Sequence, residues 1–331
     1  MIRTLSVIRG RGTDPFRNLA LESALLESVS DGQMILYLWQ NRDTVVIGRN
    51  QNIWKECNMT EIRKDGVTVV RRPSGGGAVF HDLGNLNFTF VARDGDYDET
   101  RQTEVILNAV RSCGISAERS GRNDLLAEGG KFSGNAYYHS RGASFHHGTL
   151  LVRSDLSRIA KYLNPDPLKL KSHGVDSVHS RVTNLSEFRS DLTVDEVQDA
   201  LIRAFETEYV LKSGLCPEPD PEQVAELEDI LRSTDWLYGR NPGFDKLLEN
   251  RFPWGGIRME FRVQNGRICS VQVWTDAMDH TLPEKLGNAL LGKLYLHQDM
   301  AQSIRKIGND PVIRDISTWI LEEERYICNL T

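Results

Sequence analysis

Residues 71–85 of the chain, RRPSGGGAVFHDLGN, combine three consecutive glycines with two preceding arginines. A glycine run that follows a β-branched segment gives a backbone that can adopt positive φ and approach a ligand closely. Successive N–H groups in such a loop can converge on an anion, and the guanidinium groups of Arg71 and Arg72 suit bidentate contact with phosphate. The segment therefore predicts a phosphate-binding loop.

The common nucleotide-binding patterns do not describe this chain. A Walker A loop ending at Gly130-Lys131 would need an earlier glycine where Leu125 stands, and Phe132 replaces its Ser or Thr. A G-x-G-x-x-G pattern within residues 75–80 fails at Phe80. A phosphate site here must follow another scheme.

A second cluster, GRNDLLAEGGKFSGNA (121–136), places Lys131 between the pair Gly129-Gly130 and the pair Ser133-Gly134. Flanking glycines let an ammonium group lie close to a polyanion or to a developing oxyanion. Asn123 and Asp124 could bind a base, a ribose or a metal, and could equally cap a turn. The cluster predicts a catalytic or phosphate-binding lysine.

The third cluster is FHHGTLLV (145–152), with adjacent His146 and His147. Neighbouring residues of a strand point to opposite faces, so the two rings cannot easily bind one metal. One histidine is expected to line a pocket and the other to pack, and the pattern does not say which. The sequence contains no Ser/His/Asp order, H-E-x-x-H motif or cysteine pair, which argues against triad chemistry and metal-dependent hydrolysis.

Composition narrows the class of protein. Forty basic and 46 acidic residues among 331 give a net charge of −6, which argues against nucleic-acid binding. No apolar run is long enough to span a membrane, and no secretory signal is evident at the N-terminus. Five widely separated cysteines fit reduced thiols in a reducing compartment. These features predict a cytoplasmic enzyme without a nucleic-acid or membrane partner.

The elements that must position these clusters follow from periodicity. Helices are predicted over 15–28, 56–65, 99–113, 155–163, 193–212, 221–233, 283–292, 297–307 and 311–325. Strands are predicted over 34–40, 44–49, 67–72 and 85–92, within the glycine-broken stretch 115–152, and on both sides of Asn265-Gly266, a favoured hairpin turn. Arg42-Asp43 is expected to form the turn between the first two strands. The order predicts an α+β fold, a mostly antiparallel sheet flanked by helices in residues 1–245, followed by a small α+β domain in residues 246–331.

At the residues of these clusters the chain resembles a known family. RRPSGGGAVFHDLGNLNFTF, GRNDLLAEGGKFSGNA, FHHGTLL and SRVTNL (180–185) are similar to signature segments of the lipoate-protein ligase A family, and so is TVVIGRNQNIWKECN (44–58). The resemblance covers nearly the whole chain. It implies the fold of the biotin/lipoyl protein ligase catalytic domain with a small C-terminal accessory domain.

The resemblance also implies an activity. The family joins lipoate to ATP to give lipoyl-AMP, with Mg²⁺ bridging the phosphates, and then transfers the lipoyl group to a lysine. The implied acceptors are apo lipoyl domains of 2-oxoacid dehydrogenase E2 subunits and the glycine-cleavage H protein, and the implied state is a monomer. Adenylation is chemically sensible because a carboxylate is a poor electrophile that needs a leaving group.

The resemblance assigns roles to particular positions. Lys131 is the implied catalytic residue, because it would contact the acyl carbonyl and the phosphate. Asp124 is the implied magnesium contact, through the phosphates. The implied ATP and lipoyl-AMP contacts are Arg72, Gly75, Gly76, Gly77, Ala78, Val79, Phe80, Asn123, Asp124 and Lys131. The implied lipoate contacts are Arg72, Ser74, Gly77, Lys131 and His147.

Other functions stay open. A transferase that uses a cysteine thioester is disfavoured, because the chain has no cysteine between Cys113 and Cys216. A lipoyltransferase that takes preformed lipoyl-AMP would carry similar motifs, and so would a non-catalytic module that only holds lipoate or a nucleotide. Biotin-protein ligase shares the architecture, but its glycine-arginine loop differs from RRPSGGG.

Overall fold

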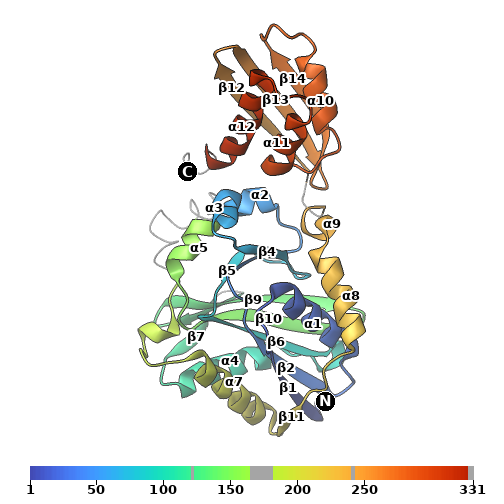
Figure 1. The fold of residues 1–331 in the computed structure, drawn as a ribbon. Coiled ribbons are helices and arrows are strands. Elements are labelled where there is room, and N and C mark those ends of the chain that lie inside the picture. Colours follow the sequence, from blue (N-terminus) through green and yellow to red (C-terminus); the bar gives the residue numbers. More distant parts are fainter. Residues whose placement is uncertain (121–122, 165–181, 240–242, 327–331) are drawn as a thin grey trace. The chain divides into compact units, whose positions relative to one another are not determined.

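The chain forms two compact units in a computed structural model that describes every residue except 121–122, 165–181, 240–242 and 327–331 (Figure 1). The first unit contains Met1–Arg49, Lys55–Cys57 and Asp65–Ser233. The second contains Asn50–Trp54, Asn58–Lys64 and Thr234–Thr331. The division predicted between residues 245 and 246 lies inside a strand of the second unit, β12 (Phe244–Phe252).

An eight-stranded sheet is the centre of the first unit, with strand order β11-β1-β2-β6-β10-β9-β8-β7. Its strands are β1 (Thr4–Arg9), β2 (Gln33–Trp39), β6 (Asn85–Arg93), β7 (Ala117–Ser120), β8 (Asp124–Ala127), β9 (Gly130–Ser140), β10 (Ala143–Leu151) and β11 (Ser213–Leu215). Strand β1 runs parallel to β2 and β11, and the other pairs are antiparallel. This arrangement confirms the predicted α+β class and the mostly antiparallel sheet.

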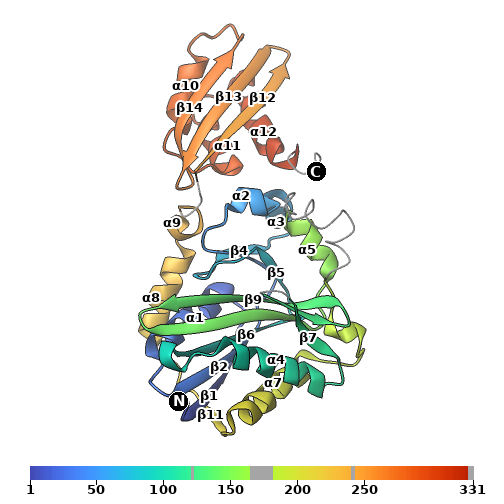
Figure 2. The same cartoon turned by 180° about the vertical axis from the view of Figure 1, so that it is seen from behind.

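Helices cover both faces of this sheet (Figures 1 and 2). Helices α4 (Glu99–Ser112) and α7 (Val194–Tyr209) pack on one face through a core that includes Phe88, Phe90 and Phe205. Helix α1 (Pro15–Ser28) lies on the opposite face and packs against α8 (Pro221–Arg232). Shorter helices are η1 (Asp94–Asp96), α5 (Leu156–Tyr162) and η3 (Leu185–Glu187).

Strand β6 alternates between the two faces, as its sequence NLNFTFVA predicts. Leu86, Phe88 and Phe90 point into the core under α4 and α7. Asn87 and Thr89 point to the other face, yet they are also fully buried. Buried polar side chains need hydrogen-bond partners. We therefore expect other polar groups on the face of the sheet that carries Asn87 and Thr89.

A second, three-stranded sheet of order β4-β3-β5 belongs to the same unit, with strands β3 (Thr44–Ile47), β4 (Thr68–Arg71) and β5 (Val79–His81). The turn predicted at Arg42-Asp43 is present, and Asp43 has a φ of 42°. However, β2 pairs with β1 and β6 whereas β3 pairs with β4 and β5. The turn therefore passes the chain from one sheet to another.

The second unit has its own sheet, in which β12, β13 (Gly255–Gln264) and β14 (Arg267–Thr275) run antiparallel. Asn265 and Gly266 both have positive φ, which confirms the predicted tight hairpin turn. Helices α10 (Leu282–Leu290), α11 (His297–Arg305) and α12 (Pro311–Tyr326) pack on one face of this sheet around Met259 and Phe261. The remaining short helices are α2 (Ile53–Glu56), α3 (Met59–Lys64) and α9 (Thr234–Leu237). Within the described ranges no helix has the length and apolar character that a membrane span requires.

Candidate functional site

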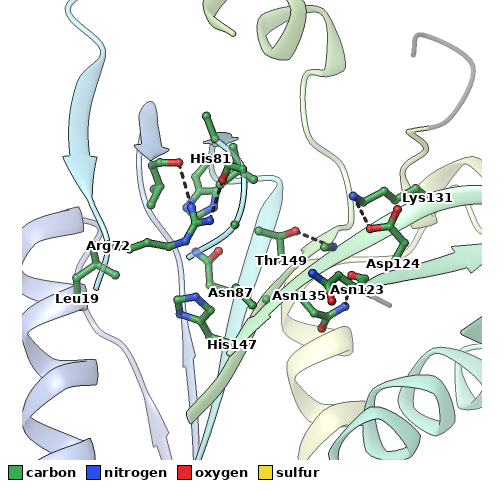
Figure 3. Close-up of a pocket in the computed structure, with 18 of the residues that line it drawn as sticks. Leu19, Arg72, His81, Asn87, Asn123, Asp124, Lys131, Asn135, His147 and Thr149 are labelled. Carbon is green, nitrogen blue, oxygen red and sulfur yellow. Dashed lines mark hydrogen bonds and ion pairs between the residues drawn. The ribbon is translucent and has the colours of Figure 1, made fainter. Parts of the chain in front are cut away.

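A cavity of about 320 Å³ opens in the first unit, between the small sheet and the polar face of the large one (Figure 3). This volume lies in the range of small-molecule sites. Its inner wall combines apolar side chains of α1, β2 and β3 with polar groups of β5, β6 and β10. The lining residues are Leu19, Trp39, Val46, Arg72, Gly76, Gly77, Ala78, Val79, His81, Asn87, Asn123, Asp124, Lys131, Gly134, Asn135, Ala136, His147, Gly148 and Thr149.

The glycine loop folds around the guanidinium group of Arg72. Arg72 Nη2 donates to the carbonyl oxygens of Gly75 at 2.6 Å and Gly77 at 2.8 Å. In a trans peptide the C=O and N–H groups point in opposite directions, so the amides of Gly76 and Ala78 face away from Arg72. Among the hydrogen bonds of the described residues, neither amide acts as a donor. The loop can therefore offer backbone N–H groups to an anion.

This geometry changes the interpretation of the two arginines. The sequence suggests two cations available to phosphate, but both guanidinium groups are buried and bound to backbone carbonyls. Arg71 Nη1 donates to the oxygens of Gly48 at 3.0 Å and Arg49 at 3.1 Å. Burial lowers the pKa of Arg72 to about 10, so it stays charged at neutral pH. The arginines hold the loop in shape, and Arg72 also contributes its charge to the cavity wall.

The loop is fixed from behind by the segment after β3. Arg49 N donates to Ser74 O at 2.9 Å, and Arg72 N donates to Ile47 O at 3.0 Å. A Cβ atom on Gly48 would lie 2.2 Å from Gly76 O, closer than any real contact. Gly48 therefore permits the close approach of two backbone segments, which side chains at this position would prevent.

A series of buried hydrogen bonds connects α1 to the glycine loop. Glu22, which is fully buried, accepts hydrogen bonds from Thr89 Oγ1 at 2.6 Å and from His147 Nδ1 at 2.8 Å. Ser74 Oγ accepts from Arg72 Nε at 3.0 Å and lies 2.8 Å from His147 Nε2, within hydrogen-bond distance. His147 therefore lines the cavity in one fixed orientation and ties the loop to the large sheet.

His81 presents a second imidazole to the cavity. It is 3% exposed, and burial, with the charge of Arg72, lowers its pKa to about 3. Asn41 Nδ2 lies 3.2 Å from His81 Nδ1, so the amide donates to that nitrogen and the proton resides on Nε2. Within the described residues Nε2 has no partner. His81 is therefore a neutral imidazole in the cavity wall whose buried Nε2–H has no partner among the described residues.

Lys131, the second residue of β9, lies on the opposite wall of the cavity. Its Nζ lies 2.7 Å from Asp124 Oδ1, and the two side chains are 34% and 41% exposed. Its backbone is held on the far side by Thr183, whose N–H donates to Lys131 O at 2.9 Å. A Cβ on Gly130 would meet Thr183 Cγ2 at 2.6 Å. The glycine before Lys131 thus admits the 182–184 segment, which explains why the GGK and VTN segments belong to one site.

Asp124 is the carboxylate predicted to contact Mg²⁺. No group of three or more His, Cys, Asp or Glu side chains suited to a metal occurs in the described part of the chain. Mg²⁺ commonly binds through one or two carboxylates, several waters and substrate phosphates. A single carboxylate beside a phosphate-binding cavity fits that pattern, so Asp124 could hold Mg²⁺ once phosphates are present.

The cavity brings together most of the residues that the sequence proposed. Nine of them line it, namely Arg72, Gly76, Gly77, Ala78, Val79, Asn123, Asp124, Lys131 and His147. Ser74 is buried behind the loop and acts through Arg72 and His147. Gly75 contributes a carbonyl to Arg72 and does not line the cavity. Positions 121–122 and 180–181, which belong to the motif segments, lie outside the described residues.

Phe80 differs from its expected role as a nucleotide contact. Strand β5 alternates, so Val79 and His81 face the cavity and Phe80 faces the other side. Phe80 is buried and packs against Tyr162 of α5, with ring centroids 5.1 Å apart. It supports the strand rather than contacting the ligand space.

The structure adds lining residues that the motifs do not assign: Leu19, Trp39, Val46, His81, Asn87, Gly134, Asn135, Ala136, Gly148 and Thr149. Some of them follow directly from strand alternation once one neighbour is placed, as His81 follows from Val79 and Thr149 from His147. Leu19 and Trp39 carry no such signal, because an apolar residue in a helix or strand is usually core.

Gly77, the last glycine of the loop, can be tested separately from folding. Gly77 has no heavy atom within 4 Å of an ideal Cβ and no positive φ, although it lines the cavity. We expect Gly77→Ala to leave the thermal unfolding midpoint unchanged but to weaken ligand binding about tenfold or more, because one methyl enters the ligand space. Calorimetric titration with lipoate and with ATP, the ligands that the family resemblance implies, measures this. Gly95→Ala, equally open but outside the cavity, is the control; wild-type affinities in Gly77→Ala would show that ligands do not approach the loop.

No cysteine lines the cavity, as far as the described residues go. Burial raises the pKa of Cys57 to about 12, and it also raises those of Cys113 and Cys216. Reactive cysteines are thiolates in polar, cationic surroundings, so these thiols are not poised as nucleophiles. Cys269 is exposed on the second unit, and Cys328 lies outside the described residues.

We therefore expect iodoacetamide at pH 8 to modify Cys269 and to leave acyl transfer unchanged. The thiolate fraction of Cys57 at that pH is on the order of 10⁻⁴, given its raised pKa. Peptide mapping combined with an activity assay checks both points. Inactivation that follows modification of Cys57, Cys113 or Cys216 would restore a cysteine-dependent mechanism.

Comparison with known proteins places both units of the chain in one family. A family model described as the lipoyl protein ligase A/B catalytic domain matches residues 14–206, and a model of the bacterial lipoate protein ligase C-terminus matches residues 241–320. The structure of P. falciparum LipL1 in complex with lipoate is similar at 29% identity and a TM-score of 0.62, covering 96% of this chain and 99% of that chain.

Two further structures are similar over the larger part of the chain. One is the bipartite lipoate protein ligase of Thermoplasma acidophilum, solved in a study of that ligase and its E2 lipoyl domain (29% identity, TM-score 0.63, 72% of this chain and 96% of that chain). The other is a lipoate-protein ligase A bound with ATP (28% identity, TM-score 0.62, 71% and 98%).

Proposed function

The chain belongs to the lipoyl protein ligase A/B catalytic domain family, and from this premise we propose that it activates lipoate with ATP and transfers the lipoyl group to protein lysines. The observation that carries the proposal is that a single cavity is lined by three chemically different kinds of group. An apolar end, an anion-binding backbone loop and an amine from β9 meet there. Those are the parts that an acyl chain, a phosphate and a developing oxyanion require.

The apolar end of the cavity suits a medium-chain acid. Leu19, Trp39 and Val46 come from three different elements and form its lining. Burial of a methylene contributes about 0.8 kcal/mol, so four methylenes contribute roughly 3 kcal/mol. An apolar wall of this kind discriminates only weakly between lipoate and octanoate, and we expect both acids to be accepted.

The loop and Lys131 face the reacting groups. In the first step the lipoate carboxylate attacks the α-phosphorus of ATP, and pyrophosphate leaves. The free amides of Gly76 and Ala78 would bind phosphate oxygens, and the Lys131 ammonium would stabilise negative charge on the phosphoryl and acyl oxygens. Mg²⁺ held by Asp124 would offset phosphate charge. In the second step a neutral acceptor amine attacks the acyl carbon, the bond from that carbon to AMP breaks, and the nitrogen loses a proton to water as the amide forms. Lys131 would stabilise the oxyanion of this step as well.

The acceptors that we propose are apo lipoyl domains of 2-oxoacid dehydrogenase E2 subunits and the glycine-cleavage H protein, modified by a monomeric enzyme. The archaeal relative was solved in a study of the ligase and its E2 lipoyl domain, which supports the first class. Four free cysteines within the described residues support a reducing compartment, and we propose the cytoplasm.

An acceptor assay tests the proposal against its alternatives. We expect wild-type protein to attach lipoate to an apo lipoyl domain in the presence of MgATP, and mass spectrometry would detect the amide. Transfer only from supplied lipoyl-AMP would instead identify a transferase that lacks the activation step. Stoichiometric lipoate binding without transfer under either condition would identify a non-catalytic binding module.

A further inference from the structure

His146 is a buried imidazole that the proposed chemistry does not use. It precedes His147 on β10 and points to the opposite face of the sheet, toward α4. It has no exposed surface and packs edge-on against Phe88, with ring centroids 5.4 Å apart. A buried polar ring in an aromatic core requires partners for both nitrogens, and these partners indicate what it does.

Both nitrogens of His146 contact side-chain amides. Nε2 lies 2.9 Å from Asn135 Oδ1, and Nδ1 lies 3.2 Å from Gln102 Oε1. Burial lowers the pKa of His146 to about 3, so the ring is neutral near pH 7 and carries a single N–H. The single N–H of a neutral ring can donate to only one of these two oxygens, so one nitrogen would face an acceptor without a hydrogen between them.

The Gln102 amide resolves this conflict. Its Nε2 has no acceptor among the described residues. Turning the amide over would let Nε2 donate to His146 Nδ1 and would remove the unpaired donor at the same time. The His146 proton then resides on Nε2 and is donated to Asn135 Oδ1.

Asn135 connects His146 to the cavity wall through hydrogen bonds to Asn123. Its backbone N–H and its side-chain Nδ2 both donate to the carbonyl oxygen of Asn123, at 2.9 and 3.0 Å. Asn123 precedes Asp124, whose carboxylate lies 2.7 Å from Lys131 Nζ, and all three residues line the cavity (Figure 3). An unbroken path of hydrogen bonds thus runs from Gln102 in the core, through His146 and Asn135, to this wall.

We propose that His146 is a positioning residue for the nucleotide side of the site: through Asn135 it holds Asn123 and Asp124 beside Lys131, while His147 holds the glycine loop through Ser74. The adjacent histidines thus orient two different walls of one cavity from the two faces of the sheet. This assignment rests on the proposed function for its kinetic consequence, because Asn123 and Asp124 are expected to contact ATP. Its structural content, the restraint on Asn123, does not depend on any activity.

The kinetic test compares His146→Phe, which keeps an aromatic ring but has no N–H, with Asn135→Ala and with the double variant. We expect each single variant to raise the KM for ATP about tenfold in lipoate-dependent pyrophosphate exchange, with the KM for lipoate within about twofold of wild type. The double variant should have the same KM for ATP as each single variant, because either substitution alone already breaks the hydrogen-bond path through His146 and Asn135. His147→Phe should instead raise the KM for lipoate. His280→Gln, at an exposed position, is the neutral control.

A structural measurement accompanies the kinetics. Hydrogen exchange at the Asn135 amide, which donates to Asn123 O, should accelerate in His146→Phe and stay at the wild-type rate in His147→Phe. If His146→Phe does not fold, the part-exposed Asn135→Ala carries the kinetic test alone. A loss of folded protein lowers the apparent kcat but does not shift the KM for ATP selectively.

The outcomes separate the two claims. Unchanged KM for ATP and unchanged Asn135 exchange in an active enzyme would overturn the role of His146 and leave the proposed function standing. If wild-type protein exchanges no pyrophosphate, the proposed function fails, and the hydrogen-exchange comparison alone decides the inference. Faster exchange at Asn135 would then support it, and an unchanged rate would overturn it.

Discussion

Lys131→Ala is expected to fold normally and to lose both half-reactions. Removal of a single group that stabilises developing charge typically costs roughly 10²–10³-fold in rate, and Lys131 is the amine on the cavity wall that faces the proposed acyl and phosphoryl oxygens. The side chain is about one-third exposed, and the strand is held by a backbone hydrogen bond from Thr183 N to Lys131 O that alanine retains. Pyrophosphate exchange and transfer from supplied lipoyl-AMP measure the two losses separately.

Lys161→Ala provides the matched control for this variant. Lys161 is 40% exposed and pairs with Asp65, but it lies on α5 and does not line the cavity. The two variants therefore lose the same charge and a comparable ion pair. Lys161→Ala should retain wild-type rates. Near-normal adenylation in Lys131→Ala would remove the catalytic assignment of this residue.

Gly48→Ala is expected to reduce activity severely, although Gly48 does not line the cavity. The added methyl carbon would lie 2.2 Å from Gly76 O, and that oxygen belongs to the loop that we propose binds the phosphates. Either the loop or the β3 end must move, because both are backbone and cannot swing aside. Overpacking of this kind costs about 1–3 kcal/mol of stability, and displacement of the loop by 1 Å can cost on the order of 10²-fold in rate.

The measurements for Gly48→Ala are chemical unfolding and adenylation on the same preparation. Gly12→Ala is the control, since an added Cβ there meets no atom within 4 Å. We expect a lower unfolding midpoint and severely reduced adenylation only in Gly48→Ala. A variant with wild-type stability and activity would show that the close backbone contact does not shape the site.

Local patterns in the sequence predicted most elements and the motif segments of the site. Helix α1 begins at Pro15 with the Asp14 side chain as its N-cap, as the Asp-Pro pair indicates. The Asn265-Gly266 turn is another example, because two positive φ values are required there. Such features depend on a few neighbouring residues and can be identified without knowledge of tertiary contacts.

The hydrogen bonds between the buried polar side chains of the site could not be predicted in the same way. Glu22 and His147 are 125 positions apart, and nothing local indicates that a glutamate in an apolar helix is buried against a histidine. The arginines before the glycines were expected to face phosphate, but the structure gives their donors to backbone carbonyls. The exposed or buried state of a polar residue is decided by packing of distant segments, as Asn87 and Thr89 on β6 also illustrate.

Lipoate-dependent exchange of labelled pyrophosphate into ATP, measured without any acceptor protein, tests the central claim most directly. Exchange reports reversible formation of the acyl-adenylate and of nothing later in the reaction. We predict exchange that requires lipoate and Mg²⁺ and that Lys131→Ala eliminates. No exchange by folded wild-type protein that binds lipoate would contradict the assignment of this cavity as an adenylation site.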